Sequence, residues 1–505
     1  MSLTTDAQPA ATAGTPVIAE GELISTSPAT GAEVGRFPVA DAQAAREAVE
    51  RARTAAEWWR RLGFDGRRER LLRWRTLMTR RMDEYLDLVH AENGKSRSDG
   101  LIEFILAIDH VAWSARNAKR VLRSRRVRSH VLLPEFAGRV EYQPYGVVGV
   151  IGPWNYPILT PMGSITYALA AGNAVVFKPS EYTPAVGNWY VERFAEVVPE
   201  QPVLQAIFGA GETGAHLVRS GVDKVAFTGS PRVGRAIMAA CAETLTPVLI
   251  EGGGKDAMIV DADADVDAAA EAAVFGAMTN AGQACVSIER AYVAAPVYDE
   301  FVRRVVDRAS RLKVGTEESA DIGPITMPGQ IDIIRRHIDD ALSRGARAVL
   351  GGPEAVQPPL VMPTVLVDVP EDAAAVREET FGPTLTITRV ADGEEALARV
   401  NASKYGLGGS VFGRARATSL ARRMRAGMVS VNGALTFAGF PALPFGGVGE
   451  SGFGRIHGDD GLREFARPKA IAKRRGPSLI PLASYDRKPR HIRMAERALR
   501  LLHGR

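Results

Sequence analysis

Apolar and polar positions follow two periods along the chain, one typical of helices and one typical of buried strands. From Asp41 to about Arg126, apolar residues recur at spacings of three and four among many Arg and Glu residues, which predicts amphipathic helices packed on a larger body. From Gly146, short β-rich runs such as GVVGVIG alternate with helical runs, and a second block of this kind extends from about Thr246 to Val431. This alternation predicts an α/β fold with two doubly wound parallel sheets.

Three segments depart from this alternation. Residues 1–20 are rich in Ala, Thr and Pro and have little to bury, so we expect a disordered tail. Residues 127–143 have a strand-like pattern interrupted by Pro134 and Gly138, which suits a hairpin that leaves the main body. The glycine-rich run LPFGGVGESGFGRIHG at 443–458 is predicted to be a loop.

The composition is that of a globular protein. The chain has 505 residues, of which 46% are hydrophobic and 24% charged, so two or three domains with sizeable cores are expected. Two cysteines exclude a disulfide scaffold and a Cys-rich zinc module, and we expect a reducing, cytoplasmic location. No apolar run reaches the roughly 18 to 20 residues that span a bilayer, and the first residues have neither a basic nor an apolar leader pattern.

The positive charge is concentrated at one end of the chain. Residues 473–505 hold ten basic and two acidic residues, a net charge of +8, so the rest of the chain carries −3 of the total of +5. We therefore expect no nucleic-acid partner for the main body. Within this end, Ile492, Leu499 and Leu502 share one face of a predicted helix with Arg residues opposite, which suits peripheral contact with an anionic membrane. Packing on a partner subunit and a solvated helix are the alternatives.

Two motifs at predicted strand ends suggest a nucleotide. In FTGSPRVG (227–234), a strand turns into a helix through Gly and Ser residues, where free N–H groups and the helix dipole favour a phosphate. In KPSE (178–181), a cation, a hydroxyl and a carboxylate follow a β-rich run, as in sites that grip ribose hydroxyls. The alternatives are a turn that needs glycine and an exposed salt bridge. Both motifs together favour dinucleotide binding.

Three side chains are candidates for chemistry. Cys285, in NAGQACVS, could lie at an open turn where helix dipoles lower the pKa of its thiol, whereas a small buried hydrophobe is the alternative and fits Cys241 fully. Glu251 precedes three glycines at a strand end and is a candidate general base; an N-cap or surface acid is the alternative. Asn155, in GPWNYP, is a candidate oxyanion donor or an ordinary turn residue.

An ordered set of motifs resembles the aldehyde dehydrogenase superfamily over about residues 40–475. The set is GPWNYP, KPSE, FTGS with Gly234, EGGGK, GQACVS, EETFGP (378–383) and PFGGVGESGFG. The run GVGESGFGRIHG resembles the class 3, fatty-aldehyde and coniferyl-aldehyde branch, and GQACVSIER also resembles some succinate-semialdehyde dehydrogenases. The resemblance implies oxidation of an aldehyde to the carboxylic acid with NAD or NADP and without a metal ion. A catalytically silent protein of the same fold is a remote alternative.

The resemblance also implies roles for individual residues. Cys285 would be the nucleophile, Asn155 and the Cys285 N–H would hold the oxyanion, and Glu251 would activate the hydrolytic water. Because the Glu181 carboxylate would accept ribose hydroxyls and repel a 2′-phosphate, NAD is favoured over NADP. The implied cofactor-binding residues are Ile151, Pro153, Trp154, Lys178, Ser180, Glu181, Gly211, Gly229, Ser230, Val233, Gly234, Glu379 and Phe381.

Departures from the family pattern bear on the substrate and on proton transfer. Gly252 follows Glu251 where most members have Leu, which suggests looser placement of that carboxylate, and Ile456 and His457 stand where relatives carry a proposed proton relay. Gly163 stands where many relatives have a Trp that narrows the substrate tunnel. A wider tunnel favours a bulky or long apolar aldehyde, with succinic semialdehyde as the alternative. The expected tunnel residues are Tyr156, Leu159, Gly163, Phe437 and Phe440.

The resemblance finally implies a domain organisation and a homodimer or homotetramer, because in the family a β-flap extends the sheet of a neighbouring subunit. The expected parts are an NAD-binding domain (21–122 and 144–250), a bridging element (123–143 and 464–475), a catalytic domain (251–435), a glycine-rich segment that closes the active site (436–463) and a basic amphipathic tail (476–505).

Overall fold

A computed structural model describes residues 14–129, 133, 135–478, 481–482 and 484–504. The first described elements are the antiparallel strands β1 (Val17–Ala19), β2 (Glu22–Thr26) and β3 (Glu33–Pro38). Of the tail expected to be disordered, residues 1–13 lie outside the described part, and the expectation is wrong for the residues of β1. This strand is ordered because it pairs with β2 along three residues.

One sheet carries the strand ends that hold the nucleotide motifs. Its six strands have the order β20-β10-β9-β6-β7-β8, and all are parallel except β20. The strands are β6 (Val147–Ile151), β7 (Ala174–Lys178), β8 (Leu204–Ala206), β9 (Lys224–Thr228), β10 (Val248–Glu251) and β20 (Gly452–Phe453). The connecting helices are α5 (Leu159–Ala171), α6 (Pro184–Val197), α7 (Gly211–Arg219) and α8 (Pro231–Ala242). Strands β6 and β7 are buried along their whole length, as central parallel strands are.

A second sheet has seven strands in the order β13-β16-β17-β12-β11-β18-β19, with only β13 antiparallel. Its strands are β11 (Asp256–Val260), β12 (Ile288–Ala294), β13 (Arg347–Leu350), β16 (Thr364–Val367), β17 (Thr384–Val390), β18 (Gly409–Phe412) and β19 (Ser430–Val431). Its helices are α9 (Val266–Met278), α10 (Tyr298–Ala309), α11 (Pro328–Ser343), α12 (Ala374–Arg377), α13 (Gly393–Asn401) and α14 (Ala417–Arg423). A short ribbon, β14 (Val356–Gln357) with β15 (Leu360–Val361), lies between β13 and β16 in sequence. The prediction of an α/β fold with two mainly parallel sheets is confirmed.

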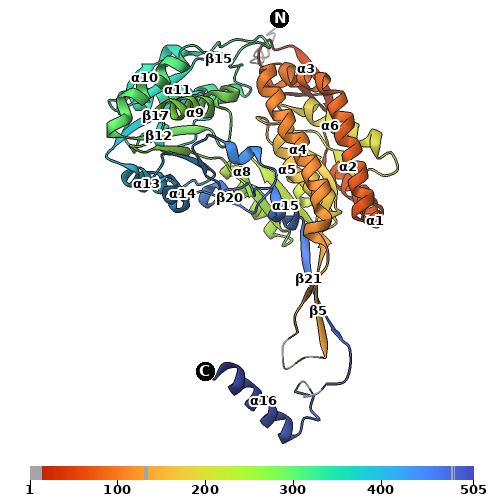
Figure 1. The fold of residues 1–505 in the computed structure, drawn as a ribbon. Coiled ribbons are helices and arrows are strands. Elements are labelled where there is room, and N and C mark those ends of the chain that lie inside the picture. Colours follow the sequence, from red (N-terminus) through yellow and green to blue (C-terminus); the bar gives the residue numbers. More distant parts are fainter. Residues whose placement is uncertain (1–13, 130–132, 134, 479–480, 483, 505) are drawn as a thin grey trace, which may run out of the picture.

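Four helices occupy the segment predicted to be amphipathic. They are α1 (Ala42–Arg61), α2 (Gly63–Arg80), α3 (Met82–Asn93) and α4 (Arg97–Leu122), and they lie against the first sheet and its helices (Figure 1). Two buried tryptophans fix this packing, because the Trp59 indole donates to the Leu169 carbonyl at 2.8 Å and the Trp74 indole to the Tyr190 carbonyl at 3.0 Å. Both rings also pack edge-on against Phe194.

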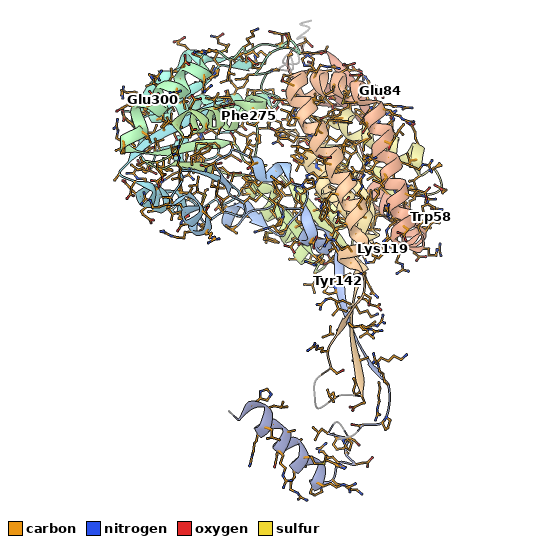
Figure 2. All side chains as sticks on the ribbon, viewed as in Figure 1. Trp58, Glu84, Lys119, Tyr142, Phe275 and Glu300 are labelled. Carbon is orange, nitrogen blue, oxygen red and sulfur yellow. The ribbon has the colours of Figure 1, made fainter. Side chains whose placement is uncertain are left out.

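A narrow three-stranded sheet, which we call the stalk, extends from the body (Figure 1). It consists of β4 (Arg125–Val127), β5 (Phe136–Pro144) and β21 (Ala466–Arg474), with β5 in the centre. Strands β5 and β21 pair along nine residues, from Pro144 opposite Ala466 to Phe136 opposite Arg474. Lys119 on α4 and Tyr142 on β5 lie near the junction of body and stalk (Figure 2).

The segment 436–463 is not a loop throughout, because it contains β20 and most of α15 (Gly458–Glu464). After the stalk, α16 (Pro489–His503) forms where an amphipathic helix was predicted, and none of its residues is buried. Figure 1 shows α16 well away from the body. Among the residues that the structure describes, no helix is both long enough and apolar enough to cross a bilayer.

Candidate active site

A cavity of about 760 Å³ lies at the carboxyl ends of the parallel strands of the first sheet. Ligands bind at this edge in open α/β sheets, because the strand ends and helix N-termini meet there. Cys285, Glu379 and Phe381 close it from the side of the second sheet. Of the predicted cofactor positions, those that line the cavity are Ile151, Pro153, Trp154, Lys178, Ser180, Glu181, Gly211, Gly229, Ser230, Val233, Glu379 and Phe381.

Gly234 is not among the lining residues. A Cβ built on it would lie 3.1 Å from Cγ2 of Ile250, so this glycine lets α8 approach β10 closely. No contact between Gly234 and the cofactor cavity is seen, and the close packing of α8 on β10 explains why a glycine stands at this position.

The strand end after β7 carries an ion pair. Lys178 Nζ lies 3.0 Å from Glu181 Oε2. Burial opposes ionisation of Glu181, but the charge of Lys178 and several hydrogen bonds outweigh it, so the pKa of Glu181 is lowered. This carboxylate is an acceptor suited to ribose hydroxyls.

Two cations that line the same cavity were not predicted. They are Arg219, at the end of α7, and Arg232, in the first turn of α8. Arg232 stands inside the FTGSPRVG motif, so its position was a usable signal, whereas Arg219 belongs to no motif. Beside them, the Ser230 hydroxyl accepts from the Val233 N–H and caps α8, whose N-terminus opens onto the cavity.

The segment before Cys285 has an unusual backbone. The 3₁₀ turn η1 (Thr279–Gly282) follows α9, and Asn280, Ala281 and Gly282 have φ values of 51°, 56° and 69°. Gly282 is required, because a Cβ there would collide with the Gly382 carbonyl oxygen. The left-handed turn lets the chain reverse between α9 and β12 and leaves Cys285 at the cavity wall.

Cys285 does not have the lowered pKa that an open turn was expected to give. Burial raises the pKa of the thiol well above its ordinary value, and the nearby Glu251 carboxylate adds to this. The side chain is nevertheless half-buried rather than enclosed. Cys241, by contrast, is buried on α8, as predicted for a packing residue.

Glu251 ends β10 and is 2% exposed. Among the described residues, neither of its carboxyl oxygens has a hydrogen-bond partner. Burial raises its pKa to about 7, against the smaller opposing effects of Cys285 and Thr228. Such a group can take up a proton near neutral pH, as a general base requires.

The expectation that Gly252 loosens the placement of Glu251 is wrong. A Cβ on Gly252 would lie 2.7 Å from the Glu450 carbonyl oxygen, so a side chain does not fit. The Gly252 N–H also donates to the Ser451 carbonyl at 3.0 Å. The backbone after Glu251 is thus held by the segment around β20.

Asn155 is fixed against the turn that carries Cys285. Its amide Nδ2 donates to the Gln283 carbonyl at 2.9 Å, two residues before Cys285. Glu379 also lines the cavity; it accepts from the Gly254 N–H at 2.8 Å, and burial raises its pKa to about 8. Asn155, Cys285 and Glu379 therefore border one cavity.

The five expected tunnel residues do not line this cavity. Phe437 is buried against Phe445, with ring centroids 6.4 Å apart, whereas Phe440 is 57% exposed. Tyr156 lies under the Lys95 ammonium group, 4.1 Å from ring centroid to Nζ, and Leu159 begins α5.

The space beside Gly163 is filled, so the expectation of a widened tunnel there is wrong. A Cβ on Gly163 would lie 2.6 Å from His457 Nε2 and 2.8 Å from Ile456 Cδ1. The His457 ring in turn stacks on His110, with centroids 3.7 Å apart. Burial lowers the pKa of His110 to about 3 and that of His457 well below its ordinary value, so both rings are neutral.

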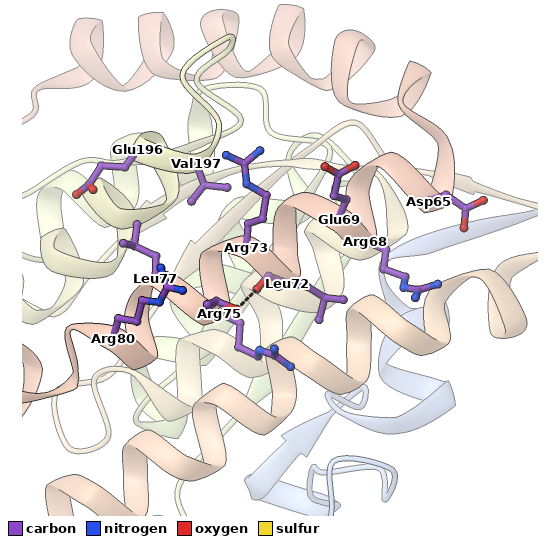
Figure 3. A pocket seen from close by; sticks show the side chains of 11 residues that line it. Asp65, Arg68, Glu69, Leu72, Arg73, Arg75, Leu77, Arg80, Glu196 and Val197 are labelled. Atoms are coloured by element: carbon purple, nitrogen blue, oxygen red, sulfur yellow. Dashed lines mark hydrogen bonds between the residues drawn. The ribbon is translucent and has the colours of Figure 1, made fainter.

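A second, more open hollow of about 970 Å³ lies over α2 and the end of α6 (Figure 3). Its lining is rich in arginine, including Arg68, Arg73, Arg75 and Arg80. It shares no lining residue with the cavity at Cys285.

The sequence and the fold match those of known proteins. The family model described as the aldehyde dehydrogenase family matches residues 18–471. A 4,4′-diapolycopene aldehyde oxidase of Methylomonas sp. is 39% identical, over 88% of this chain and 84% of that protein. A glutarate-semialdehyde dehydrogenase of Pseudomonas putida is 35% identical, over 88% and 93%. The solved NAD-dependent aldehyde dehydrogenase of Sinorhizobium meliloti superposes with a TM-score of 0.85 at 31% identity, over 90% and 91% of the two chains.

These matches identify the class that the two sheets and the cavity had suggested. The chain belongs to the aldehyde dehydrogenase family. It is an oxidoreductase that acts on an aldehyde with NAD or NADP, since the Sinorhizobium neighbour is named NAD-dependent and a solved Escherichia coli neighbour, 32% identical with a TM-score of 0.85, is named an NADP-dependent enzyme.

Proposed function

We propose that Cys285, Asn155 and Glu251 carry out the oxidation of a bulky or long-chain apolar aldehyde, with NAD as the preferred cofactor. The observation that carries this proposal is the single cavity that joins twelve predicted cofactor positions to Cys285 and Asn155. Glu251 ends the adjoining strand, and its neighbour Gly252 lines the cavity.

The residues of the cavity fit a dinucleotide. Lys178 and the Glu181 carboxylate suit the hydroxyls of one ribose, the N-terminus of α8 suits the pyrophosphate, and Glu379 suits the second ribose. Arg219 and Arg232 line the same cavity, and their positive charges would attract the 2′-phosphate of NADP. When bound, the nicotinamide group accepts two electrons and the hydrogen from the substrate carbon.

The chemistry of this chain begins with a proton transfer. The raised pKa keeps the Cys285 thiol protonated near neutral pH, so its ionisation needs a base. The adjacent Glu251 carboxylate, with a pKa of about 7, takes this proton. The thiolate then forms a C–S bond to the aldehyde carbon, and the carbonyl electron pair moves to oxygen. Asn155 Nδ2 and the Cys285 N–H stabilise this oxyanion.

After loss of hydrogen and two electrons, the substrate is a thioester on Cys285. Glu251, having released its proton to solvent, takes a proton from water as the water attacks the thioester carbon. The C–S bond breaks, the carboxylic acid leaves, and the sulfur of Cys285 is restored. Each step uses a group at the wall or edge of one cavity.

The apolar substrate is supported by the relative from Methylomonas, whose name states 4,4′-diapolycopene aldehyde. A semialdehyde is the second candidate, because the Pseudomonas relative is named for one. Its carboxylate would need a fixed cation. Arg290 does not fit this role, since it is 5% exposed and donates through Nε and Nη2 to the Lys255 carbonyl at 3.1 and 2.7 Å.

We also propose a homodimer or homotetramer and peripheral membrane contact through residues 476–505. The stalk has two edge strands, β21 and β4, whose free backbone groups suit pairing with another chain. The exposed apolar side chains of α16 and its Arg residues suit an anionic bilayer surface.

A substrate panel tests the proposed function. Purified enzyme is mixed with NAD or NADP and a long-chain, an aromatic or a succinic-type aldehyde, and absorbance of the reduced cofactor is recorded. We expect the highest kcat/KM with the long-chain aldehyde and NAD. Cys285→Ser should abolish turnover at an unchanged Tm, whereas Cys241→Ser, the matched control, should retain it. Absence of aldehyde-dependent reduction with either cofactor would overturn the proposal.

A further inference from the structure

Helix α4 bears two carboxylates that lie outside the cofactor cavity but contact the loops that form it. Asp99 and Glu103 are four residues apart and therefore lie on one face of the first turns of α4. The cofactor cavity includes neither residue. Each of them bonds to a loop that carries a proposed catalytic group, one loop from each sheet.

Asp99 holds the turn before Cys285. Its Oδ1 accepts from the Thr279 hydroxyl at 2.9 Å, and its Oδ2 accepts from the Asn280 N–H at 2.7 Å. Asn280 and Ala281 are non-glycine residues in left-handed conformations, which persist only where the surroundings over-determine them. Asp99 supplies part of that constraint.

Glu103 holds the loop that carries Asn155. Its Oε1 accepts from the N–H groups of Ile158 and Leu159 at 3.0 and 3.1 Å, and so caps α5, whose own N-cap residue Ile158 has no side chain suited to this. Its Oε2 is paired with Lys95 Nζ, and both side chains are fully buried. Lys95 Nζ also donates to the Asn155 carbonyl at 2.9 Å.

The two halves of this network meet at Asn155. The Asn280 amide donates to the same Asn155 carbonyl at 3.0 Å, and the Asn155 amide donates to the Gln283 carbonyl at 2.9 Å. The loop from the first sheet and the turn from the second sheet are thus tied to each other and, through Asp99, Glu103 and Lys95, to α4.

We propose that Lys95, Asp99 and Glu103 are positioning residues that fix the Asn155 amide relative to Cys285 across the two sheets. This inference rests on the proposed function of Asn155 and Cys285. A buried ion pair is by itself weak evidence for a contribution to stability, because desolvation of both charges offsets their attraction. The Lys95–Glu103 pair is instead explained by its geometry, because it holds the Asn155 loop in one position at the oxyanion site.

Two variants and one control test the proposal in the full-length enzyme. Asp99→Asn weakens the contact with the turn, and Lys95→Met/Glu103→Gln removes both buried charges together, so that neither is left unpaired. Asp109→Asn, an exposed carboxylate on the same helix, is the control. Measurements are Tm, NAD affinity by fluorescence titration, kcat, KM, and the rate of Cys285 alkylation by iodoacetamide across pH in a Cys241→Ser background.

We expect kcat to fall about 10- to 100-fold in both variants with KM changed less than about threefold, because a small misplacement of an oxyanion donor costs that much. The alkylation profile of Cys285 should also shift in Asp99→Asn, while NAD affinity and the control stay at wild-type values. The proposal is overturned if, in Asp99→Asn, kcat stays within about twofold of wild type and the alkylation profile of Cys285 is unchanged. If the double variant does not fold, Asp99→Asn alone decides.

The alkylation measurement separates this proposal from the proposed function. If the wild type oxidises no aldehyde of the panel, the proposed function fails, but the alkylation profiles still show whether Asp99 controls the placement of Cys285. If the wild type is active, and if kcat and the alkylation profile of Cys285 are unchanged in Asp99→Asn and in the double variant, only the positioning role fails.

Discussion

The Glu251 carboxyl is buried without a hydrogen-bond partner among the described residues, which is costly for a polar group. Lys178 and Glu181, which line the cavity, are instead paired with each other. The two carboxyl groups therefore suit different tasks. A paired carboxylate stays ionised and holds hydroxyls, whereas an unpaired buried carboxyl exchanges its proton near neutral pH.

This difference predicts a pH dependence. With a pKa of about 7, Glu251 is protonated below neutrality and cannot act as a base, so kcat should rise as pH increases through about 7 and level off above it. Glu251→Gln should lower kcat by about 100-fold or more, with accumulation of acyl-enzyme. Glu243→Gln, an exposed acid nearby in sequence, is the control. A flat profile, or a fully active Glu251→Gln variant, would contradict the role.

At the level of residues, the sequence predicted which side chains lie at the cavity where a motif fixes both the strand end and the side chain. Ser230 and Glu181 are such cases, since each lies two or three residues after the end of a parallel strand and lines the cavity. It failed at Gly163, because the space left by a glycine depends on which distant residue fills it, here His457. It also missed Asp99 and Glu103, whose spacing on an amphipathic helix looks like an ordinary solvated face.

At the scale of elements, α4 and α15 meet through two stacked imidazoles. His110 comes from α4, and His457 directly precedes α15 with a φ of 63°. Among the described residues, both nitrogens of His457 and Nε2 of His110 lack a hydrogen-bond partner. Such rings are tolerated only while they are neutral.

This contact predicts acid sensitivity. The folded-state pKa of His110 is about 3 against an ordinary 6.5, so below pH 6.5 the unfolded chain binds a proton that the folded chain does not. Stability is therefore lost as pH falls, by about 1.4 kcal/mol per pH unit per histidine, or about 3 kcal/mol for His110 at pH 4.5. The urea midpoint, measured between pH 7.5 and 4.5, should fall less steeply in His457→Leu than in wild type. His503→Leu, which replaces an exposed histidine, is the control. Identical slopes in His457→Leu and wild type would rule out this role of the contact.

The sequence predicted the elements with clear periodicity and missed those defined by distant partners. Helices α1 to α4 and the buried strands β6 and β7 show their pattern locally. Strand β20 has two residues in a glycine-rich run, and only its pairing with β10 makes it a strand. The same holds for β1, which lies in a segment of low apolar content.

At the scale of the whole molecule, the stalk and α16 extend away from the body (Figure 1). Helix α16 carries exposed apolar side chains, with Ile492, Leu499 and Leu502 between 42% and 54% exposed. An isolated helix of this length is marginal in water, so a surface that covers its apolar face would stabilise it.

Deletion of residues 476–505 tests the membrane proposal. The full-length enzyme should co-sediment with vesicles containing anionic lipid, and the deletion should weaken this by at least about tenfold, because each Arg near such a surface contributes about 1 kcal/mol. Neutral vesicles and high salt should abolish binding of the full chain. Molar mass by light scattering should show a dimer or tetramer for both proteins. Equal sedimentation of the two would exclude a membrane role for the tail.

The return of the chain to its first sheet has a consequence for synthesis. Strand β10 is synthesised about 200 residues before its edge partner β20. In the folded protein Ile250 pairs with Phe453, and Glu251 pairs with Gly452. While the ribosome completes the second sheet, the edge beside the proposed base stays open and unpaired. A nascent chain can therefore assemble the nucleotide-facing strands early, but it cannot hold Glu251 in a working position until nearly nine-tenths of the protein has been translated.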